Sequence, residues 1–512
     1  MAEKTVQKQK SAKKNYFYNL VYQFLLLIAP LITTPYISRV IGVSGVGQYS
    51  FTYSITSYFV LLASLGFGFY AQREIARHDS SKKNQSILFW EIMICKFLSM
   101  GLALCIDLAL IFAGVYQEYT LLMKLLLINI VSTFFDVSFF FQGREEFGLL
   151  ALVNSIAKIL GVVCIFVFVK SENDLWLYAI FQSAIMALPY FVLFFFLPKR
   201  LEKVSLSELH FTRHLVPTLR LFVPTIAASI YTMLDRTLIG LMVTGEKTII
   251  GEDGVEIVKK ISDLENGYYE QAEKIVKMAM TVITSLGTVM IPRNSKEIAS
   301  GHVDKFIENI YKSLRFAFFL GVPIFLGLLA VANNFCPWFF GEGYEKVPAL
   351  MMIFSPIVLI IGLSNVLGLQ CLIPEKQDGK FTIAITCGAI INLCLNLIFI
   401  PFYQSFGAAI ASVIAESIVT ATMFVFVRKQ ISFVKAIKAS WKYFVAGSVM
   451  FIAVFTTQHF LTPSPVYTCL LVIEGMLIYA LLLLLLKDSA FLSIGKNILS
   501  RLKRGKQTDK TN

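Results

Sequence analysis

The stretch LLVIEGMLIYALLLLLL, residues 470–486, runs directly into a basic tail that begins at Lys487. A helix of roughly 20 apolar residues crosses the ~30 Å of hydrocarbon in a bilayer, because each helical residue adds about 1.5 Å. Apolar runs of this kind recur along the whole chain. The pattern therefore predicts an all-α integral membrane protein with many spans.

The composition supports the same class. Of 512 residues, 56% are hydrophobic and 15% are charged, against about 45–50% and about 25% in soluble domains. The net charge of +13 lies mostly in short loops and both tails, where Lys and Arg set membrane orientation. We therefore expect no nucleic-acid partner. Because the polar N-terminus leads into a run too long for a signal-peptide core, we expect an uncleaved first span.

Apolar runs between polar breaks predict about fourteen transmembrane helices. The predicted spans are 16–39, 47–72, 87–112, 119–142, 148–169, 175–197, 215–243, 268–292, 307–331, 348–372, 381–402, 406–427, 443–460 and 466–486. An even number of spans places both termini on one side. That side carries 31 Lys and Arg residues in its loops and tails, and the other side carries five. By the positive-inside rule, both termini are predicted to be cytoplasmic.

One outer connection, 244–266, is much longer than the others and carries six acidic residues and three Lys. The segments around GEDG could form a small hairpin, whereas VEIVKKISDL also has helical spacing. The sequence leaves both open.

The chain contains signs of an internal repeat. Gly47-Gln48-Tyr49 opens the second span and Gly267-Tyr268-Tyr269 opens the eighth. Gly47 lies 31 residues after the start of the first span. Gly267 lies 52 residues after the start of the seventh, and removing an insertion of about 21 residues makes the two distances equal. We therefore predict two six-helix lobes and two extra helices. The predicted divisions are a basic tail (1–15), an N-lobe (16–197), a C-lobe (215–427, with the insertion 244–266), helices 13–14 (443–486) and a second basic tail (487–512).

Ionisable residues inside predicted spans are costly unless each has a partner or a watered cavity. Lys158 and Glu416 lie near the middle of their spans, and Arg220, Asp235 and Arg236 share the seventh. Asp235 and Arg236 are adjacent, so they point about 100° apart on a helix and cannot pair with each other. At least one of them needs a partner elsewhere.

Lys158, Arg220 and Arg236 are predicted to line a cavity. A cationic cavity favours an anionic substrate such as a phosphate group. Glu416 is the candidate for ion coupling, with a hydrogen bond to a neighbouring helix as the structural alternative. Lys274 and Lys277 are further substrate-binding candidates.

Some of these charges also have a purely structural interpretation. Glu270–Lys274 and Glu273–Lys277 are i,i+4 pairs, and Glu308 can pair with Lys312. Such pairs neutralise charge along one helix face without any ligand.

No other group of residues in the sequence indicates a catalytic, metal or cofactor site. The phosphate-loop motif of ATPases is absent. His210 and His214 are four residues apart but have no third ligand nearby, so no metal is expected. The eight Cys include no C-x-x-C pair, and we expect no cofactor and no catalytic residue.

Three stretches resemble a known family. They are KNYFYNLVYQFLLLIAPLITTPYISRVIGVSGVGQYSFTYSI (14–55), FFFQGREEFGLLALVNSIAKIL (139–160), and MLDRTLIG (233–240) with GYYEQAEKIVKMAMTVITSLGTVMIPR (267–293). They resemble the Wzx-type polysaccharide repeat-unit flippases of the multidrug/oligosaccharidyl-lipid/polysaccharide exporter superfamily. The resemblance extends to about residue 430, and Arg39, Asp235 and Arg236 match its motifs best.

The resemblance implies two lobes around a cationic cavity that moves undecaprenyl-diphosphate-linked oligosaccharide across the bacterial plasma membrane by alternating access. Membrane lipids, a glycan polymerase and chain-length regulators are the further partners it implies. The insertion 244–266 is atypical of the family.

Three alternatives remain open from the sequence. A drug/cation antiporter of the same superfamily would favour unpaired carboxylates in the first lobe, where the deepest charge is Lys158. A peptidoglycan-precursor flippase is chemically close. A membrane glycan polymerase would be an enzyme with large outer loops bearing Arg or His, but 244–266 contains neither.

Overall fold

The computed structural model describes residues 2–77, 81–250 and 256–493. The chain forms two compact units, which are considered separately. Unit 1 comprises Met1–Glu270 and Leu393–Ala408, and unit 2 comprises Gln271–Asn392 and Ala409–Asn512. The predicted division into two lobes and two extra helices stays a prediction.

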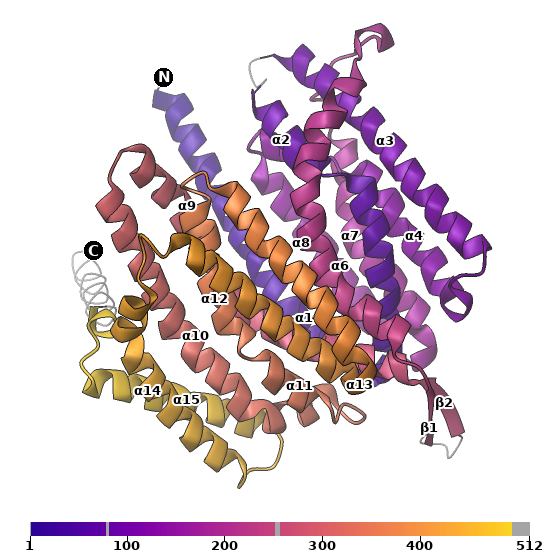
Figure 1. Cartoon of the computed structure of the whole chain (residues 1–512). Helices are drawn as coiled ribbons and strands as arrows, with labels where there is room; N and C mark the ends of the chain where they lie inside the picture. The colour runs from indigo at the N-terminus through magenta and orange to yellow at the C-terminus, as the bar shows by residue number, and fades with distance from the viewer. Residues whose placement is uncertain (1, 78–80, 251–255, 494–512) are drawn as a thin grey trace, which may run out of the picture. The chain divides into compact units, whose positions relative to one another are not determined.

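Unit 1 is built almost entirely of helices (Figure 1). Its elements are α1 (Ala2–Ser64), α2 (Phe67–Arg77), α3 (Lys82–Phe112), η1 (Gln117–Tyr119), α4 (Thr120–Phe135), α5 (Ser138–Gly143), α6 (Phe147–Phe168), η2 (Glu172–Asp174), α7 (Leu175–Phe195), η3 (Leu206–Glu208), η4 (Phe211–His214), α8 (Leu215–Met242) and the strands β1 (Glu246–Ile250) and β2 (Glu256–Lys260). Helices α9 (Ile261–Ala299) and α13 (Asp378–Val427) contribute residues to both units.

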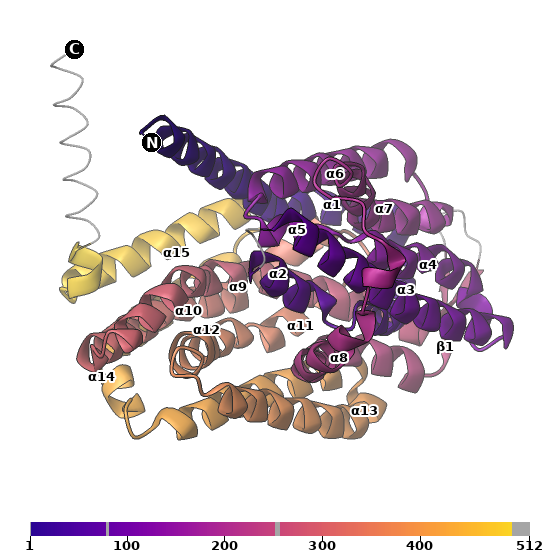
Figure 2. The same cartoon turned by 90° about the horizontal axis from the view of Figure 1, so that it is seen from above.

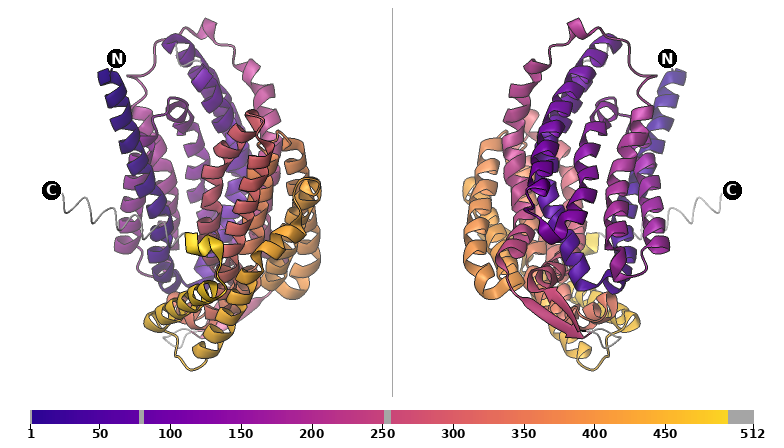
Figure 3. Two further views of the ribbon diagram at one scale, coloured as in Figure 1. Left: turned by 90° about the vertical axis from the view of Figure 1, so that its left-hand side faces the viewer. Right: turned by 90° about the vertical axis from the view of Figure 1, so that its right-hand side faces the viewer.

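Unit 2 is also helical. It contains α10 (Val303–Phe340), α11 (Val347–Phe354), α12 (Ile357–Leu367), the π-helical segment η5 (Gly368–Leu372), α14 (Phe433–Gln458) and α15 (Pro465–Leu485). Helix α10 packs against α12, α14 and α15. Figure 3 shows α14 and α15, in yellow, packed side by side.

The core of unit 1 follows from the apolar faces of its helices. Helix α1 packs against α3, α4, α6 and α8, and α7 packs against α4 and α6; Figure 2 shows α6 and α7 as neighbours. Large side chains such as Phe89, Phe140 and Phe141 are fully buried where α2, α3, α5 and α6 meet. Many other apolar side chains are exposed, as expected where lipid replaces water.

The fold class predicted from sequence is confirmed. Eleven helical runs among the described residues are long and apolar enough to cross a membrane. Two of them, Val21–Arg77 and Asp378–Val427, each contain two predicted spans. All fourteen predicted spans are mostly helical, but the number of crossings stays a prediction.

The predicted connections 40–46 and 403–405 are both present as kinks, each made by one residue of non-helical backbone conformation. Gly42 in α1 has φ 72°, which glycine tolerates because it has no Cβ. Gln404 in α13 has φ 53°, a conformation that costs a non-glycine residue roughly 1–3 kcal/mol. The backbone N–H and the hydroxyl of Ser405 both donate to the buried carboxylate of Glu265, which compensates for this strain.

Three predicted single spans are interrupted. The span 47–72 breaks between α1 and α2, where Leu65 and Gly66 both have positive φ. The span 119–142 breaks between α4 and α5, where Asp136 Oδ1 accepts a hydrogen bond from the backbone N–H of Ser138 at 3.0 Å and so replaces a helical bond. The span 348–372 breaks at Pro356, the N-cap residue of α12, because proline has no N–H and clashes with the preceding turn.

The insertion 244–266 forms a hairpin followed by a helix. Strands β1 and β2 are antiparallel and pair Glu246 with Lys260 and Thr248 with Val258. Their Ile, Val and Thr residues favour strands, and α9 begins directly after them at Ile261. The connection 251–255 lies outside the described residues. Figure 1 shows the hairpin next to the end of α8.

Candidate functional site

The two stretches MLDR and GYYE meet in unit 1. Asp235 and Arg236 lie on α8, and Tyr269 and Glu270 lie on the first part of α9. Each residue of the first pair contacts one residue of the second. The expectation that adjacent charges on one helix require partners elsewhere is therefore confirmed for both residues.

Asp235 is held by two neutral donors. The residue is 7% exposed. It accepts hydrogen bonds from the hydroxyl of Tyr269 and from the side-chain amide of Asn396 on α13. A buried carboxylate needs such donors, because desolvation without them costs several kcal/mol.

Arg236 forms an ion pair. Its Nε lies 2.9 Å from Oε2 of Glu270, and both side chains are less than one-fifth exposed. The hydroxyl of Ser50 on α1 donates to the same Oε2 at 3.1 Å. Three helices therefore converge on the Glu270 carboxylate.

Hydroxyl groups extend this polar cluster along α1 and α8. Thr237 Oγ1 lies 2.9 Å from Ser54 Oγ and 3.1 Å from the hydroxyl of Tyr58. The neighbouring rings of Tyr49 and Tyr178 form an edge contact at 4.9 Å. We name Asp235, Arg236, Tyr269, Glu270, Asn396 and Ser50 the α8–α9 cluster.

The same region contains a very close helix crossing. A Cβ on Gly47 would lie 1.7 Å from the carbonyl oxygen of Asp263, and one on Gly267 would lie 2.2 Å from that of Val43. These are the two glycines of the predicted repeat. Gly47 contacts the residue four positions before Gly267, and Gly267 contacts the residue four positions before Gly47. Such reciprocal contacts are typical of two-fold interfaces, so this crossing is consistent with the repeat.

The other predicted site residues are distributed over both units. Arg39 is exposed on α1, and Lys158 is half-buried on α6. The side chain of Arg220 lies outside the described residues. Lys274, Lys277 and Glu416 are half-buried residues of unit 2. Whether these residues share one cavity with the α8–α9 cluster stays a prediction.

Two of the three predicted structural pairs are confirmed. Lys277 Nζ lies 2.6 Å from Oε1 of Glu273, and Lys312 Nζ lies 2.6 Å from Oε1 of Glu308. The first pair leaves Lys277 neutralised along its own helix, which weakens its case as a substrate ligand.

A second polar cluster was missed by the sequence analysis. Glu91 on α3 is fully buried. It accepts hydrogen bonds from Nη2 of Arg213 at 2.6 Å and from the backbone N–H of His210 at 2.6 Å. Nε2 of His214 lies 2.7 Å from the same carboxylate, and its Nδ1 lies 2.8 Å from the hydroxyl of Tyr70.

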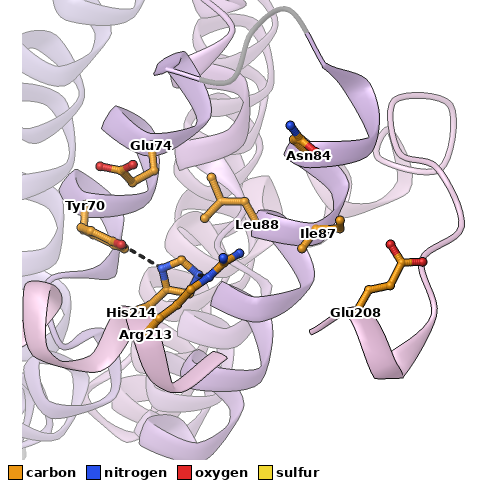
Figure 4. Close-up of a pocket in the computed structure, with 8 residues that line it drawn as sticks. All are labelled: Tyr70, Glu74, Asn84, Ile87, Leu88, Glu208, Arg213 and His214. Atoms are coloured by element: carbon orange, nitrogen blue, oxygen red, sulfur yellow. Dashed lines mark hydrogen bonds between the residues drawn. The ribbon is translucent and has the colours of Figure 1, made fainter. Parts of the chain in front are cut away.

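Three residues of this cluster, Tyr70, Arg213 and His214, border a cavity of about 460 Å³, and Figure 4 shows them grouped on one side. Glu74 and Glu208 also line it, so an anionic ligand is disfavoured there. The cluster ties α2 and α3 to η4. Its signals in the sequence are Glu91, four residues inside a predicted span, and the spacing of His210 and His214, which we considered above only for a metal.

Comparison with known proteins adds independent information. A family profile described as polysaccharide biosynthesis protein matches residues 12–298, and one described as lipid II flippase MurJ matches residues 262–480. A protein of Escherichia coli (strain K12), described as a candidate O-antigen transporter, is 23% identical over 421 residues. The match covers 82% of this chain and 97% of that protein.

Solved structures share the fold. A lipid II flippase MurJ in an inward closed conformation superposes with a TM-score of 0.70 at 17% identity, covering 92% of this chain and 99% of that one. An inward-facing multidrug transporter of the MATE family, in the MOP superfamily, gives a TM-score of 0.58 at 12% identity, covering 82% and 95%.

Proposed function

Since this chain belongs to the polysaccharide biosynthesis protein family, as the resemblance of its motifs to polysaccharide flippases predicted, we propose that it is a lipid-linked oligosaccharide flippase. Its cargo is an undecaprenyl-diphosphate-linked repeat unit, which it moves from the inner to the outer leaflet of the bacterial plasma membrane. The product serves surface polysaccharide synthesis. A glycan polymerase and chain-length regulators are the proposed partners on the outer side.

The observation that carries this proposal is the α8–α9 cluster. It lies where the MLDR and GYYE stretches meet, and it holds a largely buried guanidinium against one carboxylate. A diphosphate carries roughly two negative charges and cannot be desolvated without matched cations. Arg236 supplies one such cation.

The ion pair with Glu270 gives Arg236 two states. Without cargo, Glu270 neutralises the guanidinium in a low-dielectric site. With cargo, a phosphate oxygen replaces the Glu270 carboxylate, because guanidinium binds both groups with the same planar geometry. An exchange of partners keeps affinity moderate, so the cargo can leave on the outer side.

Further residues are proposed around this step. Lys158 and Arg220 supply the additional positive charge, and Arg39 and Lys274 extend the site. The two predicted lobes alternate between inward and outward access. Glu416 is proposed to couple transport to an ion gradient, because a carboxylate at mid-span can exchange a proton within a cavity.

A second candidate is a peptidoglycan-precursor flippase. It is favoured by the match of residues 262–480 to the lipid II flippase profile. Both candidates move a lipid-linked glycan and differ in the sugar. The drug/cation antiporter is less favoured, because the deepest charge predicted for the first lobe is a cation, Lys158. The relatives are described as transporters or flippases, and we propose no enzymatic activity.

The proposal is tested in a bacterial strain that makes the lipid-linked repeat unit but lacks its own flippase. The chain is expected to restore surface polysaccharide, measured by surface labelling, and to deplete the lipid-linked pool of the inner leaflet. Arg236→Ala should abolish export, and Arg236→Lys should retain part of it.

Arg73→Ala, at a 51% exposed side chain, is the matched control. Restoration of cell-wall synthesis in a strain without its lipid II flippase, and no restoration of surface polysaccharide, would favour the second candidate. Membrane insertion of every variant is checked separately. Normal export by Arg236→Ala, Lys158→Ala and Arg220→Ala would place the phosphate site elsewhere.

A further inference from the structure

A second cavity in unit 1 lies next to the β-hairpin. Its volume is about 670 Å³, within the range of ligand pockets. It is bounded by the loop 115–119, the end of α8, the base of the hairpin and the Phe51 region of α1. By the predicted topology, it opens on the outer side of the membrane.

Aromatic rings of fixed orientation form part of its wall. The hydroxyl of Tyr116 donates to Oδ1 of Asp107 at 3.0 Å, and that of Tyr119 donates to Oδ1 of Asp263 at 2.7 Å. The ring of Phe51 contacts Tyr119 edge-on at 5.2 Å. Because both phenolic groups are bonded to buried carboxylates, their rings are held in place.

The charges of the lining disfavour a phosphate. Lys260 Nζ lies 2.9 Å from Oε2 of Glu118, so these two charges cancel. Glu246 adds a negative charge at the base of the hairpin. Gln117 and Ser262 offer neutral hydrogen-bonding groups. The cavity thus combines the half-buried ring of Tyr119 with several donors and acceptors and has no surplus of cations.

We propose that this cavity binds sugar rings of the transported glycan on the outer side. A sugar presents C–H bonds on one face, which stack on the negative face of an aromatic ring, and hydroxyl groups at its rim, which bond to carboxylates and amides. This inference rests on the proposed function and names a separate subsite for the saccharide, apart from the α8–α9 cluster.

The hairpin has a defined role in this proposal. It forms one wall of the cavity through Glu246 and Lys260. A second ion pair, between Lys259 Nζ and Oε1 of Glu172 at 3.0 Å, holds the same hairpin with residues that do not line the cavity. The chain therefore offers a matched pair of substitutions, Glu118→Gln inside the site and Glu172→Gln outside it.

The test uses the full chain, purified in lipid nanodiscs. The probe is the water-soluble oligosaccharide that mild acid releases from the host's own lipid-linked pool, and binding is measured by equilibrium dialysis. The wild type and Glu172→Gln should bind equally. Glu118→Gln and Gln117→Ala should each weaken binding about fivefold, as expected for one lost hydrogen bond. Leu241→Trp, at a 63% exposed lining residue, should block binding sterically.

Several results would overturn the proposal. They are no saccharide binding by the wild type, equal binding by the Glu118→Gln and Glu172→Gln variants, or binding of tetraphenylphosphonium in place of the saccharide. The last result would indicate a site for organic cations. Export in the complementation strain is measured in parallel. A chain that exports glycan but binds no free saccharide refutes only the subsite, whereas a chain that exports none refutes the proposed function.

Discussion

Gly47 of α1 and Gly267 of α9 lie against each other in unit 1, and a Cβ on Gly47 would come within 2.9 Å of the backbone nitrogen of Gly267. Only glycine permits such an approach, because any side chain would displace one helix backbone from the other. The two residues open the second and eighth predicted spans, so the matching positions of the predicted repeat are in direct contact.

Replacing either glycine should therefore be costly. We expect Gly47→Ala and Gly267→Ala each to destabilise the protein by about 1–3 kcal/mol, the range for overpacking, and to reduce export. Gly101→Ala on α3 is the control, because no atom lies within 4 Å of its added Cβ; that change should be neutral or slightly stabilising. Thermal unfolding in detergent measures the effect. Equal Tm values for Gly47→Ala and Gly101→Ala would contradict the close crossing.

The ion pair of Arg236 and Glu270 predicts a separation of folding from transport. Arg236→Glu or Glu270→Arg alone should destabilise unit 1, because each places like charges together in a site less than one-fifth exposed. The double exchange should restore much of the stability, measured as Tm. Export should stay low in the double variant if cargo phosphate needs a cation on α8. Full export by the double variant would indicate a structural pair.

The Glu91 cluster predicts a stability effect far from the α8–α9 cluster in sequence. Glu91→Gln should lower stability by about 1–3 kcal/mol, because a buried acceptor of bonds from Arg213 and His210 loses its charge. Glu208→Gln is the control, since its pair with Lys83 is solvent-exposed and such pairs contribute about 0–1 kcal/mol. The unfolding midpoints of the two variants are compared. Similar midpoints would show that the buried cluster contributes no more to stability than the exposed ion pair.

Glu146 predicts a pH dependence. It lies between α5 and α6. Burial raises the pKa of its carboxyl, but the hydrogen bonds and positive charges of Arg200 and Arg144 lower the pKa by more. The net result is a pKa below the ordinary value of 4.5. A depressed pKa stabilises the fold above the ordinary pKa, and this contribution is lost as the pH falls through the folded pKa. The stability difference between wild type and Glu146→Gln should therefore be largest near neutral pH and shrink below pH 4.5. A difference that is constant from pH 7 to the acid range would refute the charge-based account.

The orientation of the chain is the fifth prediction. A reporter that is active only outside the cytoplasm, fused after residue 512, should give no signal. The loops and tails on the side of the termini carry 31 Lys and Arg residues, against five on the other side, which predicts that the termini are cytoplasmic. The same reporter placed in the connection 251–255 should be active. Activity at the C-terminal fusion would overturn the predicted topology and the outer position of the saccharide cavity.

Much of the fold was predictable because hydrophobicity is a local property. An apolar run such as 470–486 must be satisfied by lipid or by other helices whatever lies elsewhere in the chain, and it forms α15. The bends were harder to predict. Gly42 and Gln404 lie in the predicted connections 40–46 and 403–405, but at each place a single residue of positive φ redirects the chain without a loop.

The sequence by itself determined that the chain is a helical membrane protein, that Asp235 and Arg236 cannot neutralise each other, and which stretches resemble a family of flippases. Adjacent residues on a helix point about 100° apart in any structure. Only the tertiary structure decided the partners. Asp235 contacts residues 34 and 161 positions away, and Glu91 contacts residues more than 100 positions away. Helix packing brings such distant segments together, and the pairing therefore depends on the assembled fold.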